Sequence, residues 1–158
     1  MDKFLDTPAL ESLVDLMRTN KQSIVFTNGC FDLLHPGHID YLQKAKTLGD
    51  VLIVALNSDD SVRQIKGESR PVNSLNDRIA MLAALECVDF VTSFQEDTPY
   101  NLIDAIKPDI LVKGGDYTKD EIVGADIVED NGGEVKILDF LPGYSSSDLI
   151  KRIQKLNE

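Results

Sequence analysis

The feature that most constrains the fold is an uninterrupted apolar run at residues 51–56, Val-Leu-Ile-Val-Ala-Leu. A strand with one face in water alternates apolar and polar residues, whereas a strand buried on both faces is apolar throughout. The run therefore predicts a central strand in a sheet that is covered on both sides. Shorter runs of apolar and β-branched residues predict the other strands at residues 24–26, 90–92, 110–112 and 135–138.

Segments with helical periodicity lie between these strands. The clearest is residues 8–19, where apolar residues recur on one face and Thr7 is the expected cap. Further helices are predicted from Pro36 onward and at residues 59–65, 76–85, 99–106, 121–131 and about 146–156. This alternation predicts an α/β, Rossmann-like, doubly wound fold. Right-handed crossovers give its five-stranded parallel sheet the order 3-2-1-4-5.

Length and composition narrow the class of protein. The 158 residues suit one domain, residues 1–158, with an N-terminal helix within 1–21 and a core over 22–158. No apolar run reaches bilayer length and no signal pattern opens the chain, so we expect no membrane association. The isolated cysteines Cys30 and Cys87 favour a reducing cytoplasm. The net charge of −11 argues against nucleic-acid binding, which needs a basic face, so a polyanionic ligand would require a local cluster of cations.

The first predicted strand turns through Gly29 into a helix that starts at Pro36. Free backbone N–H groups and the helix dipole make such a turn a binding place for phosphate. The chain's two histidines, His35 and His38, are three residues apart, which places both on one face of the helix start. Gly37 between them leaves that face open to a ligand. The turn therefore predicts a phosphate cradle with two hydrogen-bond donors; a metal pair is the rival interpretation, but spacing signals no third ligand.

Two other segments complete this predicted site. The strand order brings residues 113–116, Lys-Gly-Gly-Asp, beside the histidine turn at the topological switch of the sheet. The glycines there allow a nucleotide to approach closely, and Asp116 can accept hydrogen bonds from ribose or base. Residues 145–147, Ser-Ser-Ser, open the last helix, whose free N–H groups suit the β- and γ-phosphates of a nucleotide.

The motif His35-Pro36-Gly37-His38, preceded by Gly29-Cys30-Phe31-Asp32, resembles the HxGH signature of the nucleotidyltransferase superfamily and its cytidylyltransferase-like members. The resemblance extends over roughly residues 22–156. It is closest to the subgroup of adenylyltransferases that act on D-glycero-D-manno-heptose 1-phosphate. The segments that carry this second resemblance are residues 70–73, 77–78, 82–85, 88–89, 96–99, 113–117 and 143–150.

The resemblance implies an activity. The chain is expected to transfer AMP from ATP to the heptose phosphate, releasing pyrophosphate and forming ADP-heptose for lipopolysaccharide core synthesis. Mg²⁺ is expected to arrive with ATP rather than in a metal site of the protein. Many relatives carry a fused sugar kinase, so this sequence resembles the stand-alone form. Relatives are often dimers, so a homodimer is possible, and the N-terminal helix can serve the subunit interface or pack on its own sheet. The alternative within the same chemistry is a cytidylyltransferase acting on glycerol 3-phosphate or another alcohol phosphate.

The resemblance also assigns roles to individual residues. Catalytic roles fall on His35, His38 and Lys66. Nucleotide-binding roles fall on Cys30, Phe31, Gly37, Lys113, Gly114, Asp116, Ser145, Ser146 and Ser147, and sugar-phosphate-binding roles on Asn57, Arg70 and Arg78.

Several of these assignments have ordinary structural alternatives. Lys66 can be a solvated loop lysine, and Arg78 an exposed charge on its helix. Relatives usually have Ser-Thr-Thr where this chain has three serines, so any one of Ser145, Ser146 and Ser147 can serve only as a helix cap. Two other function classes remain. An oxidoreductase would lack its GxGxxG motif after the first strand, and a non-catalytic nucleotide-binding module would tolerate loss of the histidines.

Overall fold

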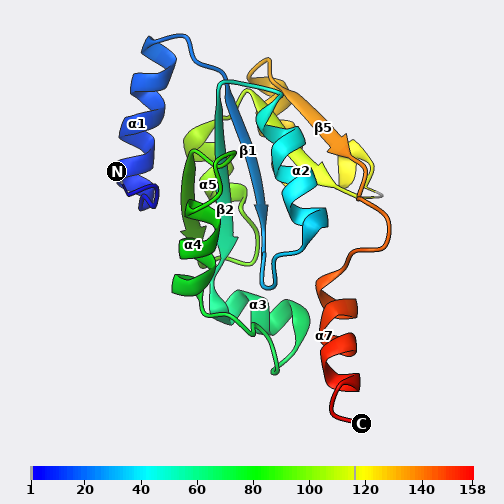
Figure 1. Ribbon diagram of the computed structural model, residues 1–158. Helices are drawn as coiled ribbons and strands as arrows, with labels where there is room; N and C mark the ends of the chain where they lie inside the picture. The colour runs from blue at the N-terminus through cyan, green and yellow to red at the C-terminus, as the bar shows by residue number, and fades with distance from the viewer. Residues whose placement is uncertain (1, 116) are drawn as a thin grey trace.

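The computed structural model describes residues 2–115 and 117–158, and its centre is a five-stranded sheet with helices on both faces (Figure 1). All neighbouring strands pair in parallel. The order β3-β2-β1-β4-β5 confirms the predicted α/β topology. The strands are β1 Ile24–Gly29, β2 Val51–Asn57, β3 Phe90–Phe94, β4 Ile110–Gly114 and β5 Glu134–Leu138.

The helices occupy the predicted segments with two corrections. They are α1 Thr7–Thr19, α2 Pro36–Lys46, α3 Asp59–Lys66, α4 Leu75–Ala83, α5 Tyr100–Ile106, α6 Ala125–Asp130 and α7 Ser146–Lys155. The cap of α1 is Asp6 rather than Thr7, because the Asp6 carboxylate accepts the N–H of Ala9 at 3.0 Å. The long helix expected at 121–131 is divided into a 3-10 turn, η1 Lys119–Glu121, and α6, because Gly124 between them has a left-handed φ of +87°.

Two apolar cores cover the sheet, one on each face. Alternate residues of β1 point to opposite sides, so Ile24 and Phe26 join one core and Val25 joins the other. The first core is closed by α1, α5 and α6, and the second by α2 and α4. All seven residues of β2 are buried, which confirms the two-sided burial expected of the run at 51–56.

The loops that connect strands to helices place the predicted functional segments at the carboxyl ends of the strands. β1 lies between β2 and β4, so its carboxyl end is the point at which the strand order reverses. The β1–α2 turn and the start of α7 both lie beyond that end, and α7 extends away from the sheet (Figure 1). None of the α7 residues is buried. Within residues 2–115 and 117–158, no helix combines the length and apolar character that crossing a membrane requires.

Candidate active site

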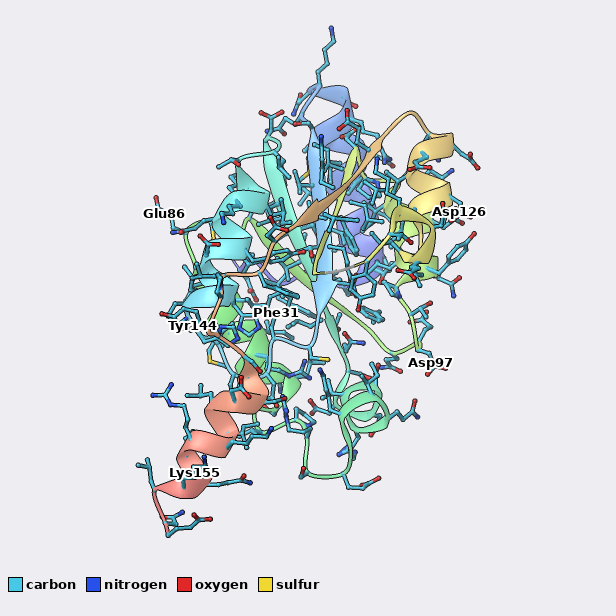
Figure 2. All side chains as sticks on the ribbon, turned by 90° about the vertical axis from the view of Figure 1, so that its right-hand side faces the viewer. Phe31, Glu86, Asp97, Asp126, Tyr144 and Lys155 are labelled. Carbon is cyan, nitrogen blue, oxygen red and sulfur yellow. The ribbon has the colours of Figure 1, made fainter. Side chains whose placement is uncertain are left out.

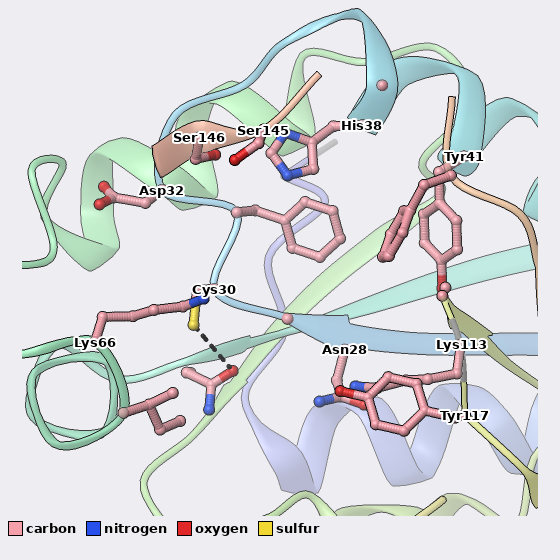
Figure 3. Close-up of a pocket in the computed structure, with 18 of the residues that line it drawn as sticks. Asn28, Cys30, Asp32, His38, Tyr41, Lys66, Lys113, Tyr117, Ser145 and Ser146 are labelled. Atoms are coloured by element: carbon pink, nitrogen blue, oxygen red, sulfur yellow. Dashed lines mark hydrogen bonds between the residues drawn. The ribbon is translucent and has the colours of Figure 1, made fainter. Parts of the chain in front are cut away.

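A cavity of about 890 Å³ opens beyond the carboxyl ends of the strands (Figure 3). Lys66 and Cys30 lie at one end of the view in Figure 3, and Lys113 and Tyr117 lie at the other. The cavity collects almost every residue predicted for the site that the structure describes. Its predicted members are Cys30, Phe31, His35, Gly37, His38, Asn57, Lys66, Arg70, Lys113, Gly114, Ser145, Ser146 and Ser147. Asp116 lies outside the described residues.

The two histidines form a stacked pair at the start of α2. Their ring centroids are 3.8 Å apart and the ring planes differ by 20°. His35 caps the helix, because its Nδ1 accepts the backbone N–H of His38 at 3.4 Å. A neutral imidazole that accepts at Nδ1 carries its proton on Nε2. His35 is therefore arranged to donate from Nε2.

Burial keeps both imidazoles neutral at physiological pH. It lowers the pKa of His35 below the usual 6.5. Burial, reinforced by the neighbouring His35, lowers the pKa of His38 to about 4, against a smaller opposing effect of the Leu33 carbonyl. The Nδ1 of His38 is buried without a partner in the described part of the chain. Neutral imidazoles can donate hydrogen bonds to negative charge that develops on a ligand. Unlike cations, they do not attract the ligand from a distance.

Gly37 allows the pair to stack. A Cβ at this position would lie 2.9 Å from the His35 ring and 3.0 Å from the Cβ of Tyr144. Tyr144, just before α7, also stacks with His35, with ring centroids 6.0 Å apart. A side chain at position 37 would thus separate the β1–α2 turn from the segment that leads into α7.

The three serines have different roles in the structure. The Oγ of Ser145 accepts the N–H of Asp148 at 3.3 Å and caps α7. The Oγ of Ser146 donates to the Leu33 carbonyl at 2.9 Å, which ties α7 to the histidine turn. Ser147 lines the cavity, and no side-chain hydrogen bond joins it to the described residues. The free backbone N–H groups in the first turn of α7 lie at the end of the helix that borders the cavity, where they can bind an anion.

The cationic side chains divide into free and committed groups. Lys66 ends α3 and is exposed, and Lys113 on β4 is half-buried. Neither forms an ion pair within residues 2–115 and 117–158. Burial lowers the pKa of Lys113, with a small opposing effect from Cys30. Burial also raises the pKa of the Cys30 thiol, so Cys30 is a neutral neighbour of these cations rather than a thiolate.

Arg78 has a different place from the one expected. It is neither an exposed helix charge nor a member of the cavity lining, because its side chain is fully buried. Its guanidinium donates four hydrogen bonds beneath the cavity. They go to the carbonyls of Asn73 at 3.1 Å, Cys30 at 2.8 Å and Asn57 at 2.9 Å, and to the carboxylate of Asp59 at 2.7 Å. The geometry supports a role in holding the β1 and β2 ends together, in place of direct contact with a phosphate.

Asp32 is a site residue that the sequence reasoning did not single out. It is 1% exposed, and its carboxylate accepts from Nε of Arg70 at 2.7 Å and from the N–H groups of Val72 and Asn73 at 2.8–3.0 Å. Burial acts to raise the pKa of Asp32, but these hydrogen bonds outweigh it and lower the pKa below 3.8. Arg70 is thereby fixed at the cavity wall. The sequence signal that could have identified Asp32 is its acidic side chain within a motif predicted to bind phosphate.

The donor set does not form a metal cage. In the described residues no group of three or more His, Cys, Asp or Glu side chains is arranged to hold a metal ion. The Asp32 carboxylate is already satisfied by Arg70 and two backbone N–H groups. The described residues therefore do not fit a resident metal ion.

Comparison with known proteins agrees with this geometry. Residues 26–152 match the cytidylyltransferase-like family. The chain belongs to that family. Family membership confirms the predicted enzyme class, nucleotidyl transfer.

Curated relatives of this family member are named bifunctional protein HldE. The protein from Histophilus somni is 53% identical over 154 residues, which is 98% of this chain and 32% of the relative. That from Helicobacter hepaticus is 57% identical over 146 residues, 92% of this chain and 30% of the relative. The chain thus spans about a third of the length of these relatives.

Solved structures agree on the fold. The lipopolysaccharide core biosynthesis protein from Thermoplasma volcanium superimposes with a TM-score of 0.62 and is 31% identical, covering 76% of this chain and 97% of that chain. Pantoate-beta-alanine ligase from Francisella tularensis has the same TM-score at 18% identity, covering 98% of this chain and 77% of that chain. The second similarity concerns the fold alone.

Proposed function

We propose that this chain transfers AMP from ATP to D-glycero-D-manno-heptose 1-phosphate, forming ADP-heptose and pyrophosphate for lipopolysaccharide core synthesis. The observation that carries the proposal is the hydrogen bond between Ser146 and Leu33, which brings the histidine pair and the α7 N-terminus to one cavity. That arrangement supplies donors for three consecutive phosphates. The identity of the acceptor rests on the HldE relatives.

The reaction in this proposal is an in-line displacement. A phosphate oxygen of the sugar phosphate attacks the α-phosphorus of ATP, and the bond from that phosphorus to the bridging oxygen of pyrophosphate breaks. The nucleophile is already an anion, so no general base is needed, and catalysis consists of alignment and charge stabilisation. His35 and His38 donate to the α-phosphate oxygens. The α7 N-terminus receives the β- and γ-phosphates, whose Mg²⁺ enters as part of the substrate.

The protein is acidic overall, but three cationic side chains line the cavity and can attract polyanionic substrates. Lys66 lies on an α3 end that is followed by Gly67 at φ +103°, and it is free to reach a phosphate of either substrate. Arg70 is held in place by Asp32 and contributes a fixed charge. Lys113 lies on the opposite side of the cavity, next to the glycines of β4 and its turn. We propose that Asp116, which follows these glycines in the sequence, contacts ribose or base.

The test is pyrophosphate release measured with four nucleoside triphosphates against a panel of sugar and polyol phosphates. We expect release with ATP and the heptose phosphate. His35→Ala and His38→Ala should each lower kcat by about 10²–10³, as loss of an oxyanion-hole donor does. Gln43→Ala, an exposed change on the same helix, is the control and should be unaffected. Release only with CTP and glycerol 3-phosphate would replace this proposal with the cytidylyltransferase alternative.

Two further properties belong to the proposal. A homodimer is proposed because Ile153 on α7 and Leu156 just after it are 51% and 83% accessible in the single chain. Light scattering after size exclusion measures the mass directly. A cytoplasmic location is proposed from the free cysteines Cys30 and Cys87 and from the use of ATP.

A further inference from the structure

The β3–α5 loop contributes a part of the cavity that the proposed chemistry leaves unused. The ends of β2 and β3 lie side by side, since Asn57 pairs with Phe94 and the N–H of Ser58 donates to the Phe94 carbonyl at 3.1 Å. Beyond that end, Asp97 and Thr98 line the cavity. Figure 2 shows Asp97 and Tyr144 on opposite sides of Phe31. The loop therefore borders the cavity away from the start of α7.

Asp97 differs from the other described carboxylates of the cavity lining. Asp32 is bound to Arg70, and Glu121 accepts the N–H of Thr118 at 2.9 Å in a capping box. Asp97 makes no hydrogen bond or ion pair with residues 2–115 and 117–158. Its exposed carboxylate borders the cavity that, in the proposed function, binds phosphates.

The chemistry of a carboxylate limits what it binds there. An ionised carboxylate only accepts hydrogen bonds, so it repels a phosphate and attracts hydroxyl groups. A metal role would require further ligands, and the described residues hold no such group around it. The nucleotide in the proposed function occupies the side of β1, β4 and α7. The acceptor then lies over the ends of β2 and β3, where it meets Lys66 through its phosphate and Asp97 through its other end.

We propose that Asp97 accepts hydrogen bonds from hydroxyl groups of the acceptor sugar and thereby selects a sugar phosphate over a shorter alcohol phosphate. Its two oxygens can accept hydrogen bonds from a neighbouring pair of hydroxyls, and Thr98, which also lines the cavity, offers a further hydroxyl. This inference rests on the proposed function and names the group that recognises the acceptor. Asp97 is exposed in the absence of substrate. A ligand that lacks the hydroxyl loses the charge-assisted hydrogen bond to this carboxylate and therefore binds less tightly.

The experiment compares Asp97→Asn and Asp97→Ala with the wild-type enzyme in steady-state kinetics of pyrophosphate release. We expect KM for the heptose phosphate to rise by about 10- to 100-fold, the value of a charge-assisted hydrogen bond, with KM for Mg-ATP unchanged. Glu96→Gln is the matched control. Its carboxylate is one residue away, accepts only the N–H of Gln95 in the described contacts and does not line the cavity.

Substrate analogues give a second, independent measurement. Deoxy analogues of the sugar phosphate should lose affinity for the wild type at one or two hydroxyl positions and lose nothing more in Asp97→Ala. An unchanged acceptor KM in both variants, or a rise in the KM for Mg-ATP instead, would overturn the inference. Failure of the proposed function looks different, since the wild-type enzyme itself would then form no ADP-sugar.

Discussion

The carboxylate of Asp32 lies 2.7 Å from Nε of Arg70, across 38 residues of chain and at a depth where Asp32 is almost inaccessible. The pair joins the turn between β1 and α2 to the loop after α3. Because two backbone N–H groups bind the same carboxylate, the loop that carries Arg70 is fixed relative to the histidines. Arg70 thus reaches the cavity in a defined position.

Asp32→Asn should lower the free energy of unfolding by about 3 kcal/mol, because it removes one partner of a buried ion pair and leaves Arg70 uncompensated. Urea denaturation measures the change. The control is Asp60→Asn, which breaks an ion pair to Arg63 in which Asp60 is 88% exposed. Exposed pairs contribute little, so the control should change stability by less than about 1 kcal/mol. Equal losses in the two variants would contradict this account.

The stabilisation by Asp32 should depend on pH in a definite direction. The pKa of Asp32 is lower in the folded protein than its ordinary value of 3.8. The charge therefore stabilises the fold fully above 3.8 and ceases to do so as the pH falls through the lower folded value. The stability difference between wild type and Asp32→Asn should therefore shrink as the pH falls below about 4 and through the folded pKa of Asp32. A difference that stays constant down to acid unfolding would show that charge is not its source.

His38 should titrate with a midpoint near pH 4, and His35 below 6.5. NMR of the imidazole protons measures both, and the His35→Ala variant assigns the two signals because the chain has no other histidine. In the unfolded chain His38 takes up a proton near pH 6.5, whereas in the folded protein it remains neutral at that pH. His38 should therefore lower stability progressively as the pH falls from about 6.5 to 4. A His38 midpoint near 6.5 would contradict the neutral-donor arrangement.

Arg78→Lys should destabilise the protein by about 3 kcal/mol or more. An ammonium group cannot reproduce the fork that satisfies three carbonyls and Asp59, and unsatisfied buried acceptors each cost about 1–3 kcal/mol. Thermal or urea unfolding checks the prediction. The same change at Arg63, which pairs only with Asp60 in the described contacts, should stay within about 0.5 kcal/mol. A stable Arg78→Lys protein with a raised KM would favour direct substrate contact instead.

Gly37→Ala should lower kcat by tenfold or more while leaving the protein folded. The new Cβ would come within 2.9 Å of the His35 ring and 3.0 Å of Tyr144, so the imidazole or the segment before α7 must move. A displacement of about 1 Å at a reacting centre costs on the order of 10²-fold in rate. Gln43→Ala adds helix propensity on α2 without this contact and serves as the control. Near-normal turnover of Gly37→Ala would show that the stacking is not required.

The sequence alone predicted the sheet and the turn segments that line the cavity. An apolar run at residues 51–56 is stable only when buried on both faces, and short runs separated by helices can form a parallel sheet. The spacing of His35 and His38 places both on one face of the helix start, and Gly37 leaves that face open. Both features follow from the local backbone, so the local sequence predicts them. The same is true of the start of α7, where Ser145 is the cap. These features required no knowledge of distant contacts.

Tertiary structure decided what the charged residues do. Arg78 was interpretable from sequence as a surface charge or a phosphate ligand, and only the meeting of the β1 and β2 ends with the loop at Asn73 turns it into a buried support. The same holds for Asp32, which is bound to Arg70, and for Asp97, which lines the cavity and has no hydrogen-bond partner in the part of the chain that the structure describes. A charge acquires its role from the groups that surround it after folding. Those groups come from distant parts of the chain, so the local pattern does not contain them.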